Sequence, residues 1–209
     1  PSVTITVTDS GTGTLADSET FTISVGEVND APTITSNGGG ASAGVTIAEN
    51  TTAVATVTAT DADGPSLTYS IAGGADAARF TIDASTGALG FVTAPNFEAA
   101  TDSSADNVYD VVVQASDGAL TATQSLAVGV SNVNEAPTAL APGSAAVNIQ
   151  ALGGTSVATL VATDPDTGDA ISFSLVDDGG GRFAVDAASG QLSVASGARL
   201  DDQGGTPFV

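Results

Sequence analysis

The sequence predicts an all-β protein built from tandem Greek-key β-sandwiches. Apolar and polar residues alternate over many short stretches, which is the period of a half-buried strand. Thr, Ser, Val, Gly and Ala dominate the composition, and this blend is typical of short strands joined by tight turns. No stretch shows the apolar stripe of an amphipathic helix. The strand count, about seven short strands in each repeat, fits two packed antiparallel sheets.

An internal repeat supports this fold class. The segment 27–32 (Glu-Val-Asn-Asp-Ala-Pro) returns 105 residues later as Asn-Val-Asn-Glu-Ala-Pro at 132–137. Three further landmarks return in the same order: 60–63 at 163–166, 79–89 at 182–192, and 8–11 at 116–118. Four landmarks that return in the same order are not explained by chance, so we interpret them as a repeating structural unit.

The repeat also predicts the domain boundaries. Residues 1–30 are expected to be the C-terminal strands of one unit, residues 31–135 a complete unit, and residues 136–209 the N-terminal part of a further unit. The joints near Pro32 and Pro137 carry no Gly/Ser tract, so we expect them to be stiff.

Individual strands follow from the alternation. The expected strands are marked by Val3-Ile5-Val7, Phe21-Ile23-Val25, Val57, Leu67-Tyr69-Ile71, Phe80-Ile82, Leu89-Phe91, Tyr109-Val111-Val113, Leu126-Val128-Val130, Ile171-Phe173-Leu175, Phe183-Val185 and Leu192-Val194. Gly87 and Gly190 each end an Asp-x-x-x-Gly turn, where a positive φ is expected. The aromatic and branched residues on these strands are interpreted as core.

Charge narrows the classes of partner. The chain has 24 acidic residues against three arginines, no Lys and no His, and a net charge of −21. Nucleic acid and anionic membrane surfaces are excluded, because both require a basic face. Cations are the natural partners, although acidic residues can also serve only for solubility. The absence of Cys excludes disulfides and thiolate metal sites, and no apolar run approaches the ~20 residues of a membrane span.

Several acidic landmarks stand in a recognisable order. They are Ala48-Glu49-Asn50, Thr60-Asp61-Ala62-Asp63, Phe80-Thr81-Ile82-Asp83 with Gly87, Asn96-Phe97-Glu98, Ala115-Ser116-Asp117-Gly118 and the linker 28–32. With these landmarks the sequence resembles the cadherin family, in the divergent form of long bacterial surface proteins. The resemblance covers the complete unit and both partial ones. It implies tandem immunoglobulin-like (cadherin-like) β-sandwiches with calcium (Ca2+) held at the joints between repeats.

The resemblance also implies the calcium ligands. At the second joint they are Glu49, Glu98, Asn132, Asn134, Glu135, Asp164 and Asp166, with Asn96 where the family prefers Asp. At the first joint they are Glu27, Asn29, Asp30, Asp61, Asp63 and Asp117. Calcium takes six to eight oxygen ligands from carboxylates, amides and the backbone, which suits this mixture.

The chain departs from the family pattern in ways that affect how many calcium ions the second joint is expected to hold. Glu135 replaces an expected Asp, and Leu152 stands where Glu49 stands one repeat earlier. Both linkers are one residue shorter than the usual form. We therefore expect one or two ions, and not three, at the second joint.

The predicted function is a calcium-binding structural or adhesive module of a long secreted or cell-surface protein, with no catalytic role. The alternatives are a calcium-independent extracellular spacer and a carbohydrate-binding sandwich. Glycan stacking needs exposed aromatics, whereas Tyr69 and Tyr109 are expected in the core, and Trp is absent. Expected partners are calcium, other repeats of the same protein, and a homophilic or cell-surface glycan partner. Because residues 136–209 lack final strands and residues 1–30 are such strands, the chain is also expected to self-associate head to tail.

Overall fold

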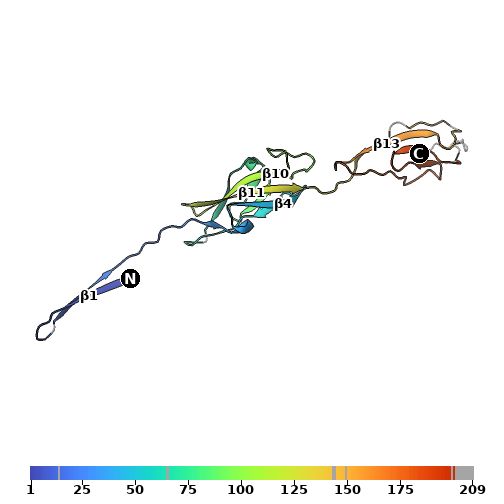
Figure 1. The fold of residues 1–209 in the computed structure, drawn as a ribbon. Helices are drawn as coiled ribbons and strands as arrows, with labels where there is room; N and C mark the ends of the chain where they lie inside the picture. The colour runs from blue at the N-terminus through green and yellow to red at the C-terminus, as the bar shows by residue number, and fades with distance from the viewer. Residues whose placement is uncertain (14, 65, 143–144, 149, 199, 201–209) are drawn as a thin grey trace. The chain divides into compact units, whose positions relative to one another are not determined.

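A computed structural model describes residues 1–13, 15–64, 66–142, 145–148, 150–198 and 200 of the chain (Figure 1). Within these ranges the chain forms fifteen β-strands and only two short 3-10 helices, η1 (Ser36–Gly38) and η2 (Ala77–Arg79). The predicted all-β class is confirmed.

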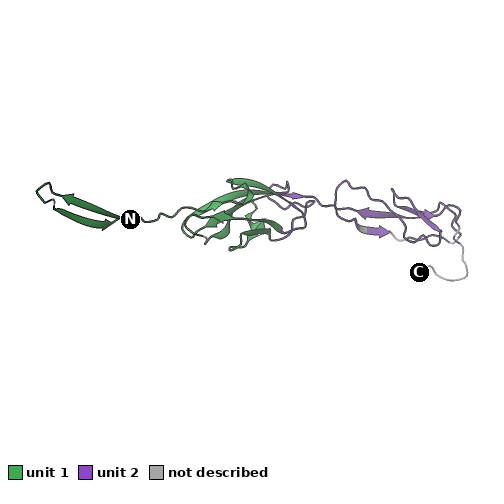
Figure 2. Ribbon diagram, turned by 90° about the horizontal axis from the view of Figure 1, so that it is seen from below, with its two compact units in different colours: residues 1–45, 53–92, 109–128 green, residues 46–52, 93–108, 129–209 purple. Residues whose placement is uncertain are grey.

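The chain divides into two compact units (Figure 2). Unit 1 comprises residues 1–45, 53–92 and 109–128, and unit 2 comprises residues 46–52, 93–108 and 129–209. Three of the boundaries between the units fall within strands, namely β4 (Ser42–Ala48), β10 (Val108–Ser116) and β11 (Thr121–Ser131). The repeat boundaries after residues 30 and 135 stay a prediction.

The first two strands form an antiparallel hairpin. β1 (Ser2–Thr8) pairs with β2 (Ala16–Thr22) in a register that runs from Ser2↔Thr22 to Thr8↔Ala16. The carboxylate of Asp9 closes the connecting loop by accepting the backbone N–H of Leu15 at 2.9 Å. All residues of both strands are exposed, so the hairpin's apolar face packs against no other part of the described chain.

The residues that follow form three sheets. A four-stranded sheet has the order β4-β11-β10-β7, where β10 is Val108–Ser116 and β7 is Thr68–Gly73 (Figure 1). A three-stranded sheet has the order β5-β9-β8, formed by Ala53–Thr56, Ala88–Phe91 and Phe80–Ile82. A short pair joins β3 (Thr33–Ile34) to β6 (Ala59–Thr60). These antiparallel sheets agree with the predicted sandwich.

Three aromatic rings form the centre of the core of unit 1. Phe80 stacks on Phe91 with ring centroids 4.4 Å apart, and Tyr109 meets both rings edge-on at 6.5 and 5.0 Å. Alternate residues of β10 and β11 complete this core, because successive strand side chains point to opposite faces. Tyr109 is 1% exposed, as predicted for a core residue.

The Asp-x-x-x-Gly turn recurs with the same hydrogen bonds in both units. Asp83 Oδ1 accepts the N–H groups of Ser85 and Thr86, and Asp186 Oδ1 accepts those of Ala188 and Ser189. The glycines that end the turns, Gly87 and Gly190, have φ values of 72° and 67°. The predicted positive φ is confirmed at both.

Unit 2 contains a sheet of order β12-β13-β15-β14. Its strands are Thr138–Pro142, Ser156–Thr163, Gln191–Val194 and Phe183–Val185. The expected strand at Ile171–Leu175 is wrong, because this segment forms no ladder with any described residue. Its alternation resembles that of β7, but a strand also requires a neighbour to accept and donate its backbone hydrogen bonds.

Candidate metal centre

Glu49 is the buried centre of the candidate site in unit 2. It directly follows β4 and is only 1% exposed. Its Oε2 accepts the backbone N–H of Phe97 at 2.8 Å, and its Oε1 accepts that of Val133, also at 2.8 Å. Charge-assisted bonds of this kind satisfy a buried carboxylate and hold its position. Glu49 therefore fastens the loop that carries Glu98 and the segment that precedes Glu135.

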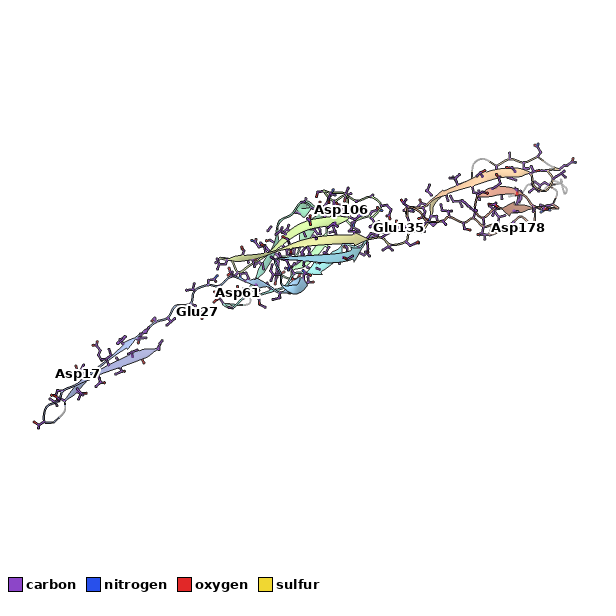
Figure 3. All side chains as sticks on the ribbon, in the orientation of Figure 1. Asp17, Glu27, Asp61, Asp106, Glu135 and Asp178 are labelled. Atoms are coloured by element: carbon purple, nitrogen blue, oxygen red, sulfur yellow. The ribbon has the colours of Figure 1, made fainter. Side chains whose placement is uncertain are left out.

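Three glutamates converge at this point. The carboxylate oxygens of Glu49, Glu98 and Glu135 lie within 4.8 Å of one another. Glu135 belongs to the segment between β11 and β12 (Figure 3), and its Oε1 accepts a 2.9 Å hydrogen bond from Asn50 Nδ2. Its other oxygen, Oε2, is buried and has no hydrogen-bond partner among the described residues. A buried carboxylate oxygen without a donor is costly, so this oxygen is suited to a cation.

The pKa of Glu98 is raised by desolvation and by the neighbouring acids. Desolvation is the largest cause that raises the pKa of Glu98 above its usual value, and the charges of Glu49, Glu135 and Asp166 raise it further. Like charges at this spacing repel one another and favour the protonated form. A divalent cation would remove the repulsion and act in the opposite direction on this pKa.

A second acidic cluster follows β13. The carboxylate oxygens of Asp164, Asp166 and Asp169 lie within 4.8 Å of one another. Asp166 is 5% exposed, and its two oxygens accept Asn132 Nδ2 at 2.7 Å and the backbone N–H of Glu135 at 2.6 Å. Because Glu135 of the first cluster donates its backbone N–H to Asp166 of the second, the two clusters adjoin within unit 2.

The structure brings together most of the residues predicted for the second joint. Glu49, Glu98, Glu135, Asp164 and Asp166 belong to the two clusters, and Asn132 reaches them through Asp166. Asn134 is exposed, and its amide donates to the carbonyl of Glu135 at 3.2 Å. The role of these residues as ligands stays a prediction.

Sequence reasoning missed Asp169. Its carboxylate joins the second cluster, yet the corresponding loop of the preceding repeat carries no acid at this point. Comparison of the repeats therefore gave no signal for it. The local pattern Asp-x-Asp-x-x-Asp after a strand was the only available sign.

The residues predicted for the first joint lie in unit 1. Asp63 Oδ2 accepts the backbone N–H of Asp30 at 2.6 Å, and Asn29 Nδ2 donates to Asp117 Oδ2 at 2.8 Å. The backbone N–H of Leu120 is the main cause that lowers the pKa of Asp117, followed by the amide of Asn29 and the N–H of Ala119. Glu27 is exposed in the segment before β3 (Figure 3).

One oxygen at the first joint resembles Glu135 Oε2. Asp61 Oδ1 accepts the N–H of Asp63 at 2.8 Å, whereas Asp61 Oδ2 is buried without a hydrogen-bond partner in the described part of the chain. Both joints thus present a buried carboxylate oxygen that lacks a donor.

The two joints share a hydrogen-bond pattern. At each one, the last acid of the linker donates its N–H to the second Asp of an Asp-x-Asp pair, at 2.6 Å for both Asp30 and Glu135. At each, the second Asp donates its own N–H to the first, at 2.8 Å for Asp63 and 3.0 Å for Asp166. The sequence repeat is therefore also a repeat of local structure.

The chemistry of these donor sets fits calcium. All candidate donors are carboxylate or amide oxygens, and the chain has neither His nor Cys. Calcium accepts many oxygen ligands in flexible geometry, whereas magnesium keeps most of its water and zinc sites are built mainly from nitrogen and sulfur. Several carboxylates and two buried oxygens without donors are a calcium-type arrangement.

Solved structures with the same fold are cadherin extracellular domains. The protocadherin GammaB4 extracellular domain is 27% identical over 98% of this chain and 36% of its own, with a TM-score of 0.52. Mouse cadherin-23 EC22-24 is 23% identical over 96% of this chain and 64% of its own (TM-score 0.52). Human protocadherin-24 EC1-2 is 21% identical over 84% and 83% of the two chains (TM-score 0.56).

These likenesses show a cadherin-like fold. The matches to the protocadherin gamma structures cover almost all of this chain, but only between about a third and a half of the length of those structures. No protein-family model matches the sequence, and no curated protein matches it either. Among the described residues, no helix has the length and apolarity needed to cross a bilayer.

Proposed function

We propose that this chain is a calcium-binding structural module of a long extracellular adhesive protein, and that calcium stiffens its joints. The convergence of Glu49, Glu98 and Glu135 within 4.8 Å, beside Asp166, carries this proposal. The similar solved structures are extracellular cadherin domains, which supports an extracellular location, a cell-surface setting and an adhesive role. The module has no catalytic role in this proposal.

The stiffening follows from where the acids come from. Glu49 directly follows β4, Glu98 lies on the loop between β9 and β10, Glu135 on the segment before β12, and Asp166 after β13. Without a cation their charges repel, which favours separation of these segments. A calcium ion bound by several of them would join the segments directly, so it would convert repulsion into a cross-link.

Calcium titration by calorimetry tests the proposal. We expect one or two ions to bind at the second joint. The substitutions Asp164→Ala and Asp166→Ala together should remove this binding. Asp177→Ala with Asp178→Ala is a matched control, because it removes the same charge from unit 2 outside both clusters. Binding that is unchanged by the first pair, or weakened equally by both pairs, would contradict the assignment.

Small-angle scattering tests the consequence for shape. The maximum dimension and flexibility of the chain should differ between calcium and chelator, and the Asp164/Asp166 variant should show no difference. Equal scattering of the unaltered chain in both conditions would favour a calcium-independent spacer.

The carbohydrate-binding alternative is not favoured, because Tyr109 is buried and Tyr69 is half-buried, with its hydroxyl bonded to the N–H of Ala59.

A further inference from the structure

One face of the β1–β2 hairpin carries Val3, Ile5, Val7 and Phe21, with the acidic Glu19 and Asp17 opposite Ile5 and Val7, and no described residue covers it. Six large apolar side chains of the two strands and of the residues that directly follow β2 are between 37% and 80% exposed: Val3, Ile5, Val7, Phe21, Ile23 and Val25. Contiguous exposed patches of this kind mark interaction sites in soluble proteins. The outer edge of β1 is also unpaired, because the hairpin forms a sheet of two strands.

Strands β10 and β11 are the sequence equivalents of this hairpin, and their apolar face is buried. A shift of 108 residues, set by the Thr8-Asp9 and Ser116-Asp117 landmarks, places β1 on β10. The linker repeat, with its shift of 105, places the residues from Phe21 to Val25 on those from Leu126 to Val130. The six equivalent residues are at most 6% exposed: Val111, Val113, Ala115, Leu126, Val128 and Val130. The face that is exposed on the hairpin is thus one that this fold buries.

The strand that pairs with β10 shows where the hairpin would dock. β10 pairs with β7 through Val113↔Ile71, Gln114↔Ser70, Ala115↔Tyr69 and Ser116↔Thr68. In unit 2 the sequence equivalent of β7 is residues 172–177, which form no ladder with any described residue. A segment whose backbone edge is unpaired is a template for strand addition.

This open segment already has the position of β7. Phe173 donates its N–H to the carbonyl of Ala187 at 3.0 Å, as Tyr69 does to that of Ala84 at 2.9 Å. The Phe173 ring also lies against Gly190, as the Tyr69 ring lies against Gly87. The acceptor edge is therefore formed in advance, and only its neighbouring strand is missing from the described structure. Phe183, the equivalent of the buried Phe80, is correspondingly half-exposed.

We propose that the β1–β2 hairpin of one copy docks on the open edge at residues 172–177 of a second copy, with β1 antiparallel to it. Transfer of the β10–β7 register gives the pairs Ile5↔Leu175, Thr6↔Ser174, Val7↔Phe173 and Thr8↔Ser172. The contact joins different surfaces of the two copies, so it extends into open chains. It needs no ion and is independent of the calcium proposal.

Engineered disulfides test the register, because the chain has no cysteine of its own. In the template pair, Ser70 Oγ and Gln114 Oε1 are 3.2 Å apart, so side chains at these positions meet on one face. A Thr6→Cys chain mixed with a Ser174→Cys chain should give a mixed disulfide on oxidation. The matched control is Thr20→Cys with Ser174→Cys, because Thr20 lies on the same hairpin face but on β2. Equal yields in the two mixtures, or none in the first, would overturn the docking.

Sedimentation of the 209-residue chain tests the association itself. All samples contain chelator, so the result does not depend on calcium. The mean mass should rise with concentration, and Val7→Asp should weaken association at least tenfold, since Val7 is 70% exposed in the single chain but would be covered on docking. A monomer at every concentration would overturn the proposal, as would association that Val7→Asp leaves unchanged.

Discussion

Replacement of Glu135 by Gln should have opposite effects in chelator and in calcium. The substitution keeps the shape of the side chain and removes one charge from the glutamate cluster. Two unit charges 4.8 Å apart repel by about 3.5 kcal/mol at an effective dielectric constant of ~20. Because Glu135 is half-exposed, solvent reduces this for the Glu49–Glu135 pair to about 1–2 kcal/mol. In chelator the variant should therefore be more stable than the unaltered chain by roughly that amount.

In calcium the order of stability should invert. The variant lacks the charge of Glu135 and its buried Oε2, so we expect calcium affinity to fall at least tenfold, or about 1.4 kcal/mol. Ligands that bind only the folded state stabilise it according to their affinity, so the variant gains less from calcium.

Thermal unfolding in chelator and in excess calcium measures both effects. A change of 1 kcal/mol corresponds to roughly 4–8 °C in the midpoint of a domain of this size. Glu19→Gln is the matched control, because Glu19 is exposed on β2 and outside both clusters. A Glu135→Gln midpoint that lies on the same side of the unaltered chain in both conditions would refute the reasoning.

Three further predictions concern protonation and backbone geometry. Because the pKa of Glu98 is raised, the folded protein in chelator binds a proton at Glu98 at a higher pH than the unfolded protein does. As the pH drops toward the usual glutamate range, the stability of the protein in chelator should therefore rise and its calcium affinity should fall. A calcium affinity that stays flat from pH 7 to 5 contradicts this prediction. The Asp83 carboxyl should titrate by NMR with a pKa of about 2, below its usual 3.8, because the N–H of Thr86 and the hydroxyl and N–H of Ser85 bind its ionised form. The stability that these bonds contribute is present above pH ~3.8 and is lost as pH falls through about 2. Titration of Asp83 at the usual value would count against these bonds. Gly87→Ala should destabilise the chain by on the order of 3 kcal/mol, because the new Cβ would lie 2.1 Å from the carbonyl oxygen of Val57 at a φ of 72°. The control is Gly118→Ala, which has a φ of 100° but no atom within 4 Å of the new Cβ, and it should cost clearly less free energy in denaturant unfolding. Equal losses for the two variants would rule out the clash.

The elements that the sequence predicted well are those set by local pattern. Val111 and Val113 alternate with polar residues along β10, and this alternation alone identifies the buried face. The Asp83–Gly87 turn was also predictable, because its hydrogen bonds and its positive φ depend on residues within the turn.

The elements that the sequence predicted poorly depend on distant neighbours. Residues 171–175 have a strand pattern, but no described strand pairs with them. Strand β4 was not identified by its alternation, because Ser, Ala and Gly dilute its apolar positions. The glutamate cluster joins residues up to 86 positions apart in the sequence, so only the family resemblance, and no spacing rule, indicated it.

The two joints show how charge varies on a shared backbone arrangement. The hydrogen bonds from linker to Asp-x-Asp pair recur at both, yet Asn132 occupies the position that Glu27 holds one repeat earlier. The Asn132 amide donates to Asp166 Oδ1, and a carboxylate such as Glu27 has no proton to donate to Asp63 in the same way. This exchange makes the first joint more negative by one charge and leaves Asp63 without that donor. The backbone contacts that define each joint do not involve the side chain at this linker position. A substitution at this position can therefore change the negative charge that a cation would neutralise at one joint without changing the backbone arrangement of that joint.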